Sequence, residues 1–143
     1  GVKVKEMPGK ILLEVVTPEK QLLSQEVDEV IAPGSEGEFG VLPGHCHFLS
    51  TLRIGELRYR VGDRTNHMAI LWGYAEVTPA KVTVMAEIAE KAEDIDVNRA
   101  QAAVEKAEQR LKSGGLPSEV KEAEISLEKA RLRRKIAERA RKS

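Results

Sequence analysis

The chain has 143 residues, enough for one well-formed core or for a small domain with an appendage. Aromatic residues make up only 3% of it, so aliphatic side chains must fill the interior, and no stretch approaches the roughly 18 consecutive apolar residues of a membrane span. The formal net charge of zero hides an asymmetry: residues 129–142 carry eight cations against one carboxylate, a net charge of +7 that leaves −7 on the rest.

A basic C-terminal segment on an otherwise acidic chain predicts a polyanionic partner or an acidic protein surface. A favourable interaction with a helix dipole would account for about two or three of these cations, but not for all of them. Cys46 is the sole cysteine, which excludes an intrachain disulfide and favours a reducing compartment. No secretory signal pattern is present, and residues 1–6 are interpreted as a remnant that precedes the natural start at Met7.

The N-terminal part shows the alternation and the turn residues of short strands. A strand is predicted over 10–17, closed by Pro18, and is followed by strands over 21–24 and 27–32 with a turn at residues 25–26 between them. Two very short strands joined by tight turns are predicted within 35–49. These elements already indicate a β-rich first half.

From Gly55 the alternation is clean, with Leu57 and Tyr59 predicted to face the core and Arg58 and Arg60 to face solvent. The apolar run over 68–72 predicts a strand buried on both faces, which is broken or bulged at residue 73 and continues over 76–78. A last strand is predicted over 82–88. So many short strands with turns between them favour an antiparallel sandwich or a flattened barrel.

Around residues 95–100 the apolar period changes from two to between three and four. This change divides the chain into a β-sandwich domain over 1–91 and a helical tail over 92–143. Asp94 or Asp96 is predicted to cap a helix that runs to about Lys112 and ends at 113–115, and Pro117 opens a second helix. The fold class is therefore predicted to be α+β, with an antiparallel sandwich of about ten short strands followed by an antiparallel two-helix hairpin.

The predicted hairpin has a thin apolar seam, because half of its members are alanines. The five larger side chains contribute on the order of 10 kcal/mol if fully buried, against an ordering cost of about 1–2 kcal/mol per residue. The hairpin is therefore predicted to be marginal without the body or a partner. Ile125, Leu132 and Ile136 form a second apolar face, which either rests on the body or serves another state. The seam comprises Val97, Ala100, Val104, Ala107 and Leu111 in the first helix, and Val120, Ala123, Leu127, Ala130 and Ala137 in the second.

No catalytic constellation stands out. His45 and His47 flank Cys46, but neighbouring strand residues point to opposite faces and no third ligand is evident, so no metal site is predicted. Cys46 is interpreted as a small core thiol. The glycines of residues 34–40 lack a lysine and precede no helix, so they form turns and not a phosphate loop. The chain is predicted not to be an enzyme by itself.

The sequence of residues 33–45, Pro-Gly-Ser-Glu-Gly-Glu-Phe-Gly-Val-Leu-Pro-Gly-His, resembles the signature of the epsilon subunits of F-type ATP synthases of bacteria and chloroplasts. Residues 12–19 resemble the opening strand of that family, and residues 95–100 resemble the element that begins its helical hairpin. The resemblance extends from Met7 to the end of the chain. One departure is Cys46-His47, where Ala-Pro is common in the family.

The resemblance implies a non-catalytic rotor subunit of the central stalk, which couples the catalytic head to the c ring in proton-driven ATP synthesis. In such a subunit the β-sandwich binds the gamma subunit and the ring of c subunits. Glu38 and His45 match the positions implied to contact the c ring. The resemblance also implies a peripheral location at the cytoplasmic face of the bacterial inner membrane, held there through the complex.

Regulation is implied for the hairpin, which lies folded on the sandwich or extends along gamma and inhibits ATP hydrolysis. In the extended state the basic second helix meets acidic segments of the beta subunits within the head formed with alpha. Clustered cations suit such docking, because they steer association and make it sensitive to salt. The residues implied for this contact are Arg131, Arg133, Arg134, Lys135 and Arg139.

No cofactor is required, but some bacterial members bind ATP as a regulatory ligand on the folded hairpin. Lys129 stands where those members carry an arginine, so the planar bidentate fork is lost there while a point charge remains. The alternative is that Asp96 only caps a helix and Arg99 pairs with a nearby carboxylate. The matching positions are Glu90, Ile95, Asp96, Arg99, Ala100, Lys129 and Arg133.

Two other functions compete with the rotor subunit. A free-standing adaptor would join its helices, including the basic one, to a partner's coiled coil. A nucleic-acid binder would use the basic helix to track phosphates, but it would need a second basic surface or stacking aromatics, and the body is acidic.

Overall fold

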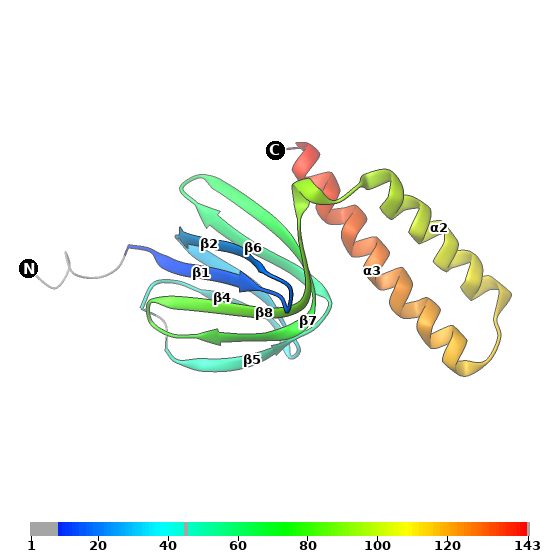
Figure 1. Cartoon of the computed structure of the whole chain (residues 1–143), viewed down its shortest axis with the longest axis horizontal. Coiled ribbons are helices and arrows are strands. Elements are labelled where there is room, and N and C mark those ends of the chain that lie inside the picture. Colours follow the sequence, from blue (N-terminus) through cyan, green and yellow to red (C-terminus); the bar gives the residue numbers. More distant parts are fainter. Residues whose placement is uncertain (1–8, 45, 143) are drawn as a thin grey trace, which may run out of the picture. The chain divides into compact units, whose positions relative to one another are not determined.

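The structure, a computed structural model, describes residues 9–44 and 46–142. The chain divides into two compact units, Gly1–Ala89 and Glu90–Ser143. In Figure 1 the strands run from blue to green and the two long helices from yellow-green to red. The predicted start at Met7 and the candidate residue His45 lie outside the described residues.

The first unit is built from strands, and the described residues contain eight of them where the sequence predicted about ten. Two predicted interruptions do not end a strand: the second strand runs through residues 25–26, and the seventh continues past residue 73. The β-sandwich followed by a helical hairpin is confirmed. The strands are β1 (Ile11–Val16), β2 (Gln21–Val27), β3 (Glu29–Gly34), β4 (Gly37–Val41), β5 (Phe48–Leu52), β6 (Gly55–Val61), β7 (Arg64–Val77) and β8 (Lys81–Lys91).

The strands are hydrogen-bonded in the order β2-β1-β8-β7-β5-β3-β4, and β6 pairs with both β3 and β7. Every pairing whose register is resolved is antiparallel except one, since β1 and β8 run parallel with Leu13 opposite Val82. The prediction of an antiparallel sandwich therefore needs one correction. A parallel pair requires a long connection, and here the whole of β2 to β7 supplies it.

The core follows from the alternation of side chains along the strands. Ile11, Leu13 and Val15 on β1 are fully buried while the residues between them are half-buried. On β6, Leu57 and Tyr59 are buried as predicted. Residues 68–71 on β7 are fully buried, which confirms the prediction of a strand buried on both faces for four of the five residues, while Trp72 is half-buried.

A local distortion marks the middle of β7. Trp72 has a φ of 60° and Gly73 a φ of 146°, so the backbone leaves the extended region at the position where the sequence predicted a break or bulge. A Cβ at residue 73 would overlap the backbone of Met85 and Ala86 on β8. Glycine is therefore required there both by the close approach of β8 and by the backbone conformation.

The second unit contains a short 3₁₀ turn, η1 (Ala92–Asp94), and two helices, α2 (Val97–Ser113) and α3 (Pro117–Lys142). Asp96, and not Asp94, is the N-cap of α2, because its Oδ1 accepts a hydrogen bond from the backbone N–H of Arg99 at 3.1 Å. At the other end Gly114 adopts a φ of 72°. Glu119 accepts a hydrogen bond from the N–H of Leu116 at 2.8 Å, which satisfies one free donor at the start of α3.

The two helices pack through the predicted seam. The buried members are small or medium in size, as expected from the alanine-rich pattern, and Leu111 packs against them from the end of α2. Neither helix in the described part of the chain is long and apolar enough to cross a membrane. The central seam residues are Val104 and Ala107 on α2, and Leu127 and Ala130 on α3.

Candidate ligand and partner sites

The second unit has a pocket of about 290 Å³ at the start of its hairpin. Three segments form it: the end of β8 with the turn that follows, the first two turns of α2, and the C-terminal half of α3. All three segments belong to the second unit, so this unit contains the whole pocket. The lining residues are Glu90, Asp94, Ile95, Asp96, Arg99, Ala100, Ala103 and Arg133.

The pocket contains the N-terminus of α2, where the helix dipole and the first backbone N–H groups favour an anion. Asp96 already uses one of these donors, the N–H of Arg99. The Arg99 guanidinium forms no hydrogen bond or ion pair with any residue that the structure describes. The structure thus shows no carboxylate partner for this guanidinium among the described residues, while the capping role of Asp96 is confirmed.

The opposite wall of the pocket is an ion pair between Glu90 and Arg133. The Nε of Arg133 lies 2.7 Å from Oε1 of Glu90, and its Nη2 lies 3.2 Å from Oε2. This bidentate geometry is the strong form of an arginine–carboxylate pair. Both side chains keep about a third of their surface exposed, so the pair remains accessible to a charged ligand.

Six of the seven residues predicted for ATP line this pocket, and Lys129 does not. Two lining residues were missed by the prediction. Ala103 lies one helical turn after Ala100, so helical periodicity could have found it. Asp94 lies in η1, and it brings the carboxylates in the pocket to three, against the two guanidinium groups of Arg99 and Arg133.

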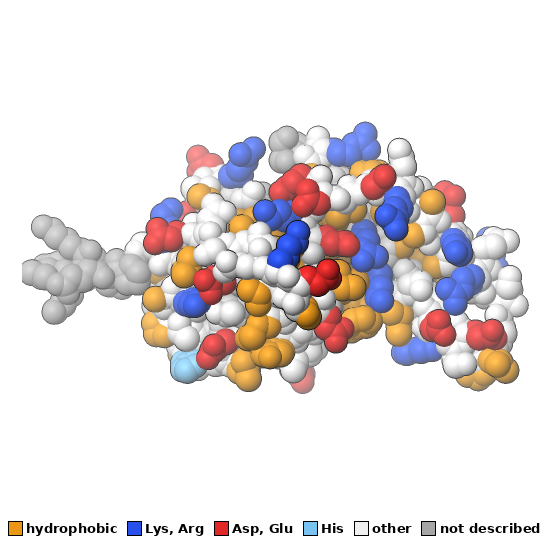
Figure 2. All heavy atoms as spheres, in the orientation of Figure 1, with side chains coloured by type: hydrophobic (Ala, Val, Ile, Leu, Met, Phe, Trp, Pro, Cys, Tyr) orange, Lys and Arg blue, Asp and Glu red, His pale blue; other side chains and the backbone are white. Residues whose placement is uncertain are grey.

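The basic residues of α3 are partly engaged inside the second unit. Arg131 lies 3.3 Å from Glu108 in an exposed pair, and Nη1 of Arg134 donates to the side-chain oxygen of Gln101 at 2.9 Å. Lys135 is exposed and Arg139 is half-buried. On the face seen in Figure 2, blue Lys and Arg side chains are interspersed with red carboxylates over the helical unit.

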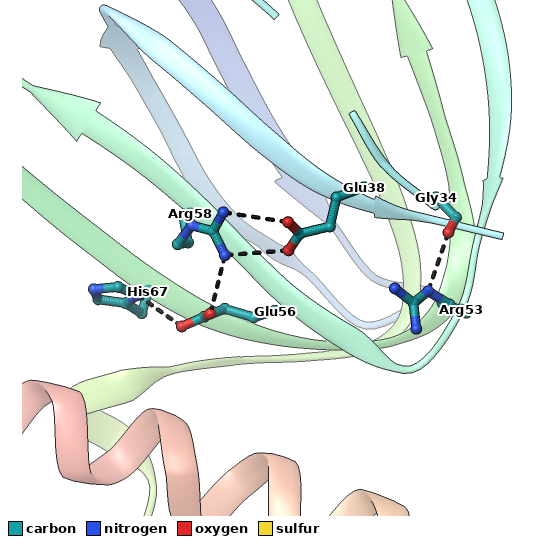
Figure 3. Close-up of polar contacts among 6 residues, drawn as sticks. All are labelled: Gly34, Glu38, Arg53, Glu56, Arg58 and His67. Carbon is teal, nitrogen blue, oxygen red and sulfur yellow. Dashed lines mark hydrogen bonds and ion pairs between the residues drawn. The ribbon is translucent and has the colours of Figure 1, made fainter. Parts of the chain in front are cut away.

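Glu38 lies on β4, in the turn-rich segment that carries the signature. Its carboxylate accepts two hydrogen bonds from Arg58 on β6, at 3.1 and 3.4 Å, as Figure 3 shows. Glu56, two residues before Arg58, is only 4% exposed although its strand position places it on the outward face. The sequence prediction assigned no role to Glu56, because alternation alone predicts a solvated carboxylate there.

Cys46 and His47 follow the signature directly. Cys46 is exposed, so its interpretation as a core thiol is wrong. Nε2 of His47 lies 3.7 Å from a carboxylate oxygen of Glu76. Within 9–44 and 46–142, no three His, Cys, Asp or Glu side chains gather in a way that could hold a metal ion.

Two family models together match nearly the whole chain. Residues 10–92 match the beta-sandwich domain of the ATP synthase delta/epsilon chain, and residues 93–138 match its long alpha-helix domain. Among curated proteins, the ATP synthase epsilon chain of Syntrophobacter fumaroxidans is 54% identical over 93% of this chain and 99% of its own length. That of Citrifermentans bemidjiense is 51% identical over 94% of this chain and 98% of its own length.

Solved structures give a similar result. A chain in the Euglena gracilis mitochondrial ATP synthase, in an assembly described as OSCP/F1/c-ring, has a TM-score of 0.77 and 26% identity, with 87% of this chain and 79% of that chain covered. A chain from the central stalk and c ring of the Tetrahymena thermophila mitochondrial ATP synthase has a TM-score of 0.58 at 15% identity, with 90% and 96% covered, and supports the fold alone.

Proposed function

The chain belongs to the ATP synthase delta/epsilon chain family, and from this premise we propose that it is the epsilon subunit of the central stalk in a bacterial ATP synthase. The observation that carries the proposal is that relatives named ATP synthase epsilon chain match both units at about half identity over nearly their full length. In this role the β-sandwich binds gamma and the c ring, and the subunit itself is not catalytic. It lies at the cytoplasmic face of the inner membrane through its complex.

The hairpin is proposed to regulate ATP hydrolysis by exchanging between a folded and an extended position. The thin seam supports this, because the helices are joined by alanines and a few larger side chains. The basic end of α3 is proposed to meet acidic segments of the beta subunits in the extended position. Arg133 and Arg134 are half-buried and bonded to Glu90 and Gln101, whereas Lys135 is exposed and Arg131 forms only an exposed pair with Glu108. Arg131 and Lys135 are therefore the residues whose loss disturbs the folded position least.

The test of regulation compares complexes reconstituted with the wild-type chain and with the Arg131→Ala, Lys135→Ala double variant. Removal of two cations that dock on acidic protein should relieve inhibition and raise ATP hydrolysis by about fivefold or more. Lys121→Ala, an exposed lysine at the start of α3, is the matched control. Unchanged inhibition would contradict the role of the basic helix, and failure to co-purify with gamma, alpha and beta would favour the free-standing adaptor.

ATP is proposed to bind in the pocket of the second unit. Three features support this: the helix N-terminus, the Arg99 guanidinium, which has no partner among the described residues, and the accessible Arg133. The three carboxylates oppose a polyanion, so we expect bound divalent cation or local rearrangement at Glu90 to accompany the nucleotide. The ligand would stabilise the hairpin, because it binds groups that only the packed helices bring together.

Titration of ATP against the chain with a fluorophore on α3 tests this binding. Arg99→Ala should remove the response, because it deletes the cation that is not already neutralised by a carboxylate. Arg110→Ala, an exposed arginine on the same helix that does not line the pocket, should respond like the wild type. No response of the wild-type chain up to millimolar nucleotide would rule out this ligand.

A further inference from the structure

Four charged side chains form a connected row across the outward face of the β unit. They come from three strands: His67 from β7, Glu56 and Arg58 from β6, and Glu38 from β4. Nδ1 of His67 lies 2.7 Å from one oxygen of Glu56, and Nη1 of Arg58 lies 3.3 Å from the other. Arg58 then reaches Glu38 with both terminal nitrogens, as Figure 3 shows.

The register explains how these residues meet. Arg58 lies opposite His67 on β7 and opposite Ile31 on β3, and Glu38 lies opposite Pro33 on the far side of β3. The distance from β6 across β3 to β4 is about two strand spacings, roughly 10 Å, and the Arg58 and Glu38 side chains bridge it together. The outward residues of β3 beneath this span are apolar, and the stem of an arginine packs well on such a surface.

Burial increases along the row from Glu38 to Glu56. The side chain of Glu38 is 45% exposed, that of Arg58 27% and that of Glu56 3%. Loss of a cationic partner is costly for a buried carboxylate, and Arg58 is one of the partners of Glu56, so this contact favours a fixed guanidinium. Burial lowers the pKa of Arg58, but the hydrogen bonds and charges of Glu38 and then Glu56 outweigh it and raise that pKa overall, so the guanidinium stays charged.

A half-exposed glutamate on an edge strand would ordinarily sample several rotamers, and a lone surface ion pair would do little to prevent it. Here the partner of Glu38 is Arg58, whose guanidinium is itself bonded to the buried Glu56 and offers two parallel N–H donors in one plane. A second arginine restrains the same hairpin, because Nε of Arg53 donates to the carbonyl oxygen of Gly34 at 3.1 Å. The carboxylate of Glu38 is thus fixed relative to the turn that carries it.

We propose that Arg58, anchored by the buried carboxylate of Glu56, is a positioning residue that holds the carboxylate of Glu38 in the orientation in which it meets the c ring. This inference rests on the proposed function, in which Glu38 contacts the ring. The inference adds Arg58 and Glu56, which lie outside the signature, to the residues that serve this contact. Because Glu38 is already ordered in the free subunit, binding to the ring does not carry the entropy cost of ordering its side chain.

The test combines two measurements on Glu38→Gln, Arg58→Gln and the double variant. In the reconstituted complex, the ratio of ATP-driven proton pumping to ATP hydrolysis reports the contact with the ring. In the isolated chain, three-bond couplings measured by NMR report the χ1 rotamer of Glu38. The matched controls are Arg60→Gln, on the same strand but paired with Asp28 and Glu29, and Glu36→Gln, an exposed acid in the same hairpin.

Arg58→Gln should average the Glu38 rotamer and lower the pumping ratio by about as much as Glu38→Gln, roughly threefold, the size expected for one accessible charge contact. The double variant should be no worse than either single one, because both remove the same interaction. Arg58→Lys keeps the charge without the fork and should fall between wild type and Arg58→Gln. Both controls should match the wild type.

The two proposals fail differently. A wild-type pumping ratio in Glu38→Gln would contradict the proposed contact of Glu38 with the ring, and the positioning role of Arg58 as well. Suppose instead that Glu38→Gln lowers the pumping ratio. The positioning role alone would then be overturned if Arg58→Gln kept the wild-type ratio or a single Glu38 rotamer. Additive losses in the double variant would also overturn it. If Arg58→Gln fails to fold, Arg58→Lys decides, since wild-type couplings and pumping in that variant would also overturn the proposal.

Discussion

At the scale of single residues, charged side chains of this protein are held by partners that are distant in the sequence. Asp28, between β2 and β3, is an example: its Oδ2 accepts a hydrogen bond from the N–H of Gly62 at 2.6 Å, and its Oδ1 lies 3.0 Å from Nζ of Lys10. The Gly62 N–H first, and then Lys10, hold the pKa of the Asp28 carboxyl below its ordinary value. Asp28 thereby ties the β6–β7 turn to the start of the sandwich.

This pKa shift predicts a loss of stability in acid. Since the folded state lowers the pKa of Asp28, its contribution is fully present above the ordinary value near pH 4 and is lost as the pH falls through the lower folded value. Asp28→Asn should therefore flatten the decrease of the unfolding temperature below about pH 4. Thermal unfolding followed by circular dichroism across that range measures it.

Asp63 provides the control for this prediction, since it follows Gly62 in the same β6–β7 turn and forms no ion pair with the described residues. Asp63→Asn should keep the acid dependence of the wild type. An equal slope in the Asp28 and Asp63 variants would show that other carboxylates account for the acid sensitivity.

At the scale of elements, the ends of the helices are specified by side chains close in the sequence. Asp96 caps α2, Gly114 ends it, and Glu119 secures the start of α3. Local signals of this kind survive in any tertiary context, which explains why the helix bounds were predicted to within about two residues. Strand bounds were predicted less accurately. Residues 25–26, predicted as a turn, are part of β2 because they pair with β1.

The cap gives an element-scale prediction. Asp96→Ala should destabilise the hairpin by about 1 kcal/mol, because the N–H of Arg99 loses its acceptor, whereas Asp96→Asn should be nearly neutral, since asparagine caps equally well. Thermal loss of helical signal in far-ultraviolet circular dichroism distinguishes the two. If asparagine costs as much as alanine, the charge of Asp96 and not its hydrogen bond maintains the helix.

At the scale of the whole molecule, each of the two units has an apolar cluster among its described residues. One apolar cluster comprises residues of the β-strands from Ile11 to Ala89, and another joins α2 to α3 through Val104, Ala107, Leu127 and Ala130. The first is much larger, and its side chains include most of the fully buried ones. Such a difference favours a β unit that is stable by itself and a hairpin that is less so.

Truncation tests this view. A chain that ends after Glu93 retains all of β8 and should unfold cooperatively in urea with a midpoint close to that of the same transition in the full chain. Trp72 is the sole tryptophan and lies in the β unit, so its fluorescence follows that unit selectively. A truncated chain without a cooperative transition would place the domain boundary elsewhere.

The sequence by itself determined the fold class, the order of the elements and the family, because periodicity, turn residues and caps are local, and because the signature at 33–45 is a contiguous string. It also named most residues of the hairpin pocket, although only through the resemblance. Tertiary structure alone decided the parallel pairing of β1 with β8, the Glu90–Arg133 pair and the row from His67 to Glu38. Except for Glu56 and Arg58, these contacts join residues that are between 11 and about 70 positions apart. The physical reason they escape prediction is that strand register and helix packing, not local pattern, bring such residues together.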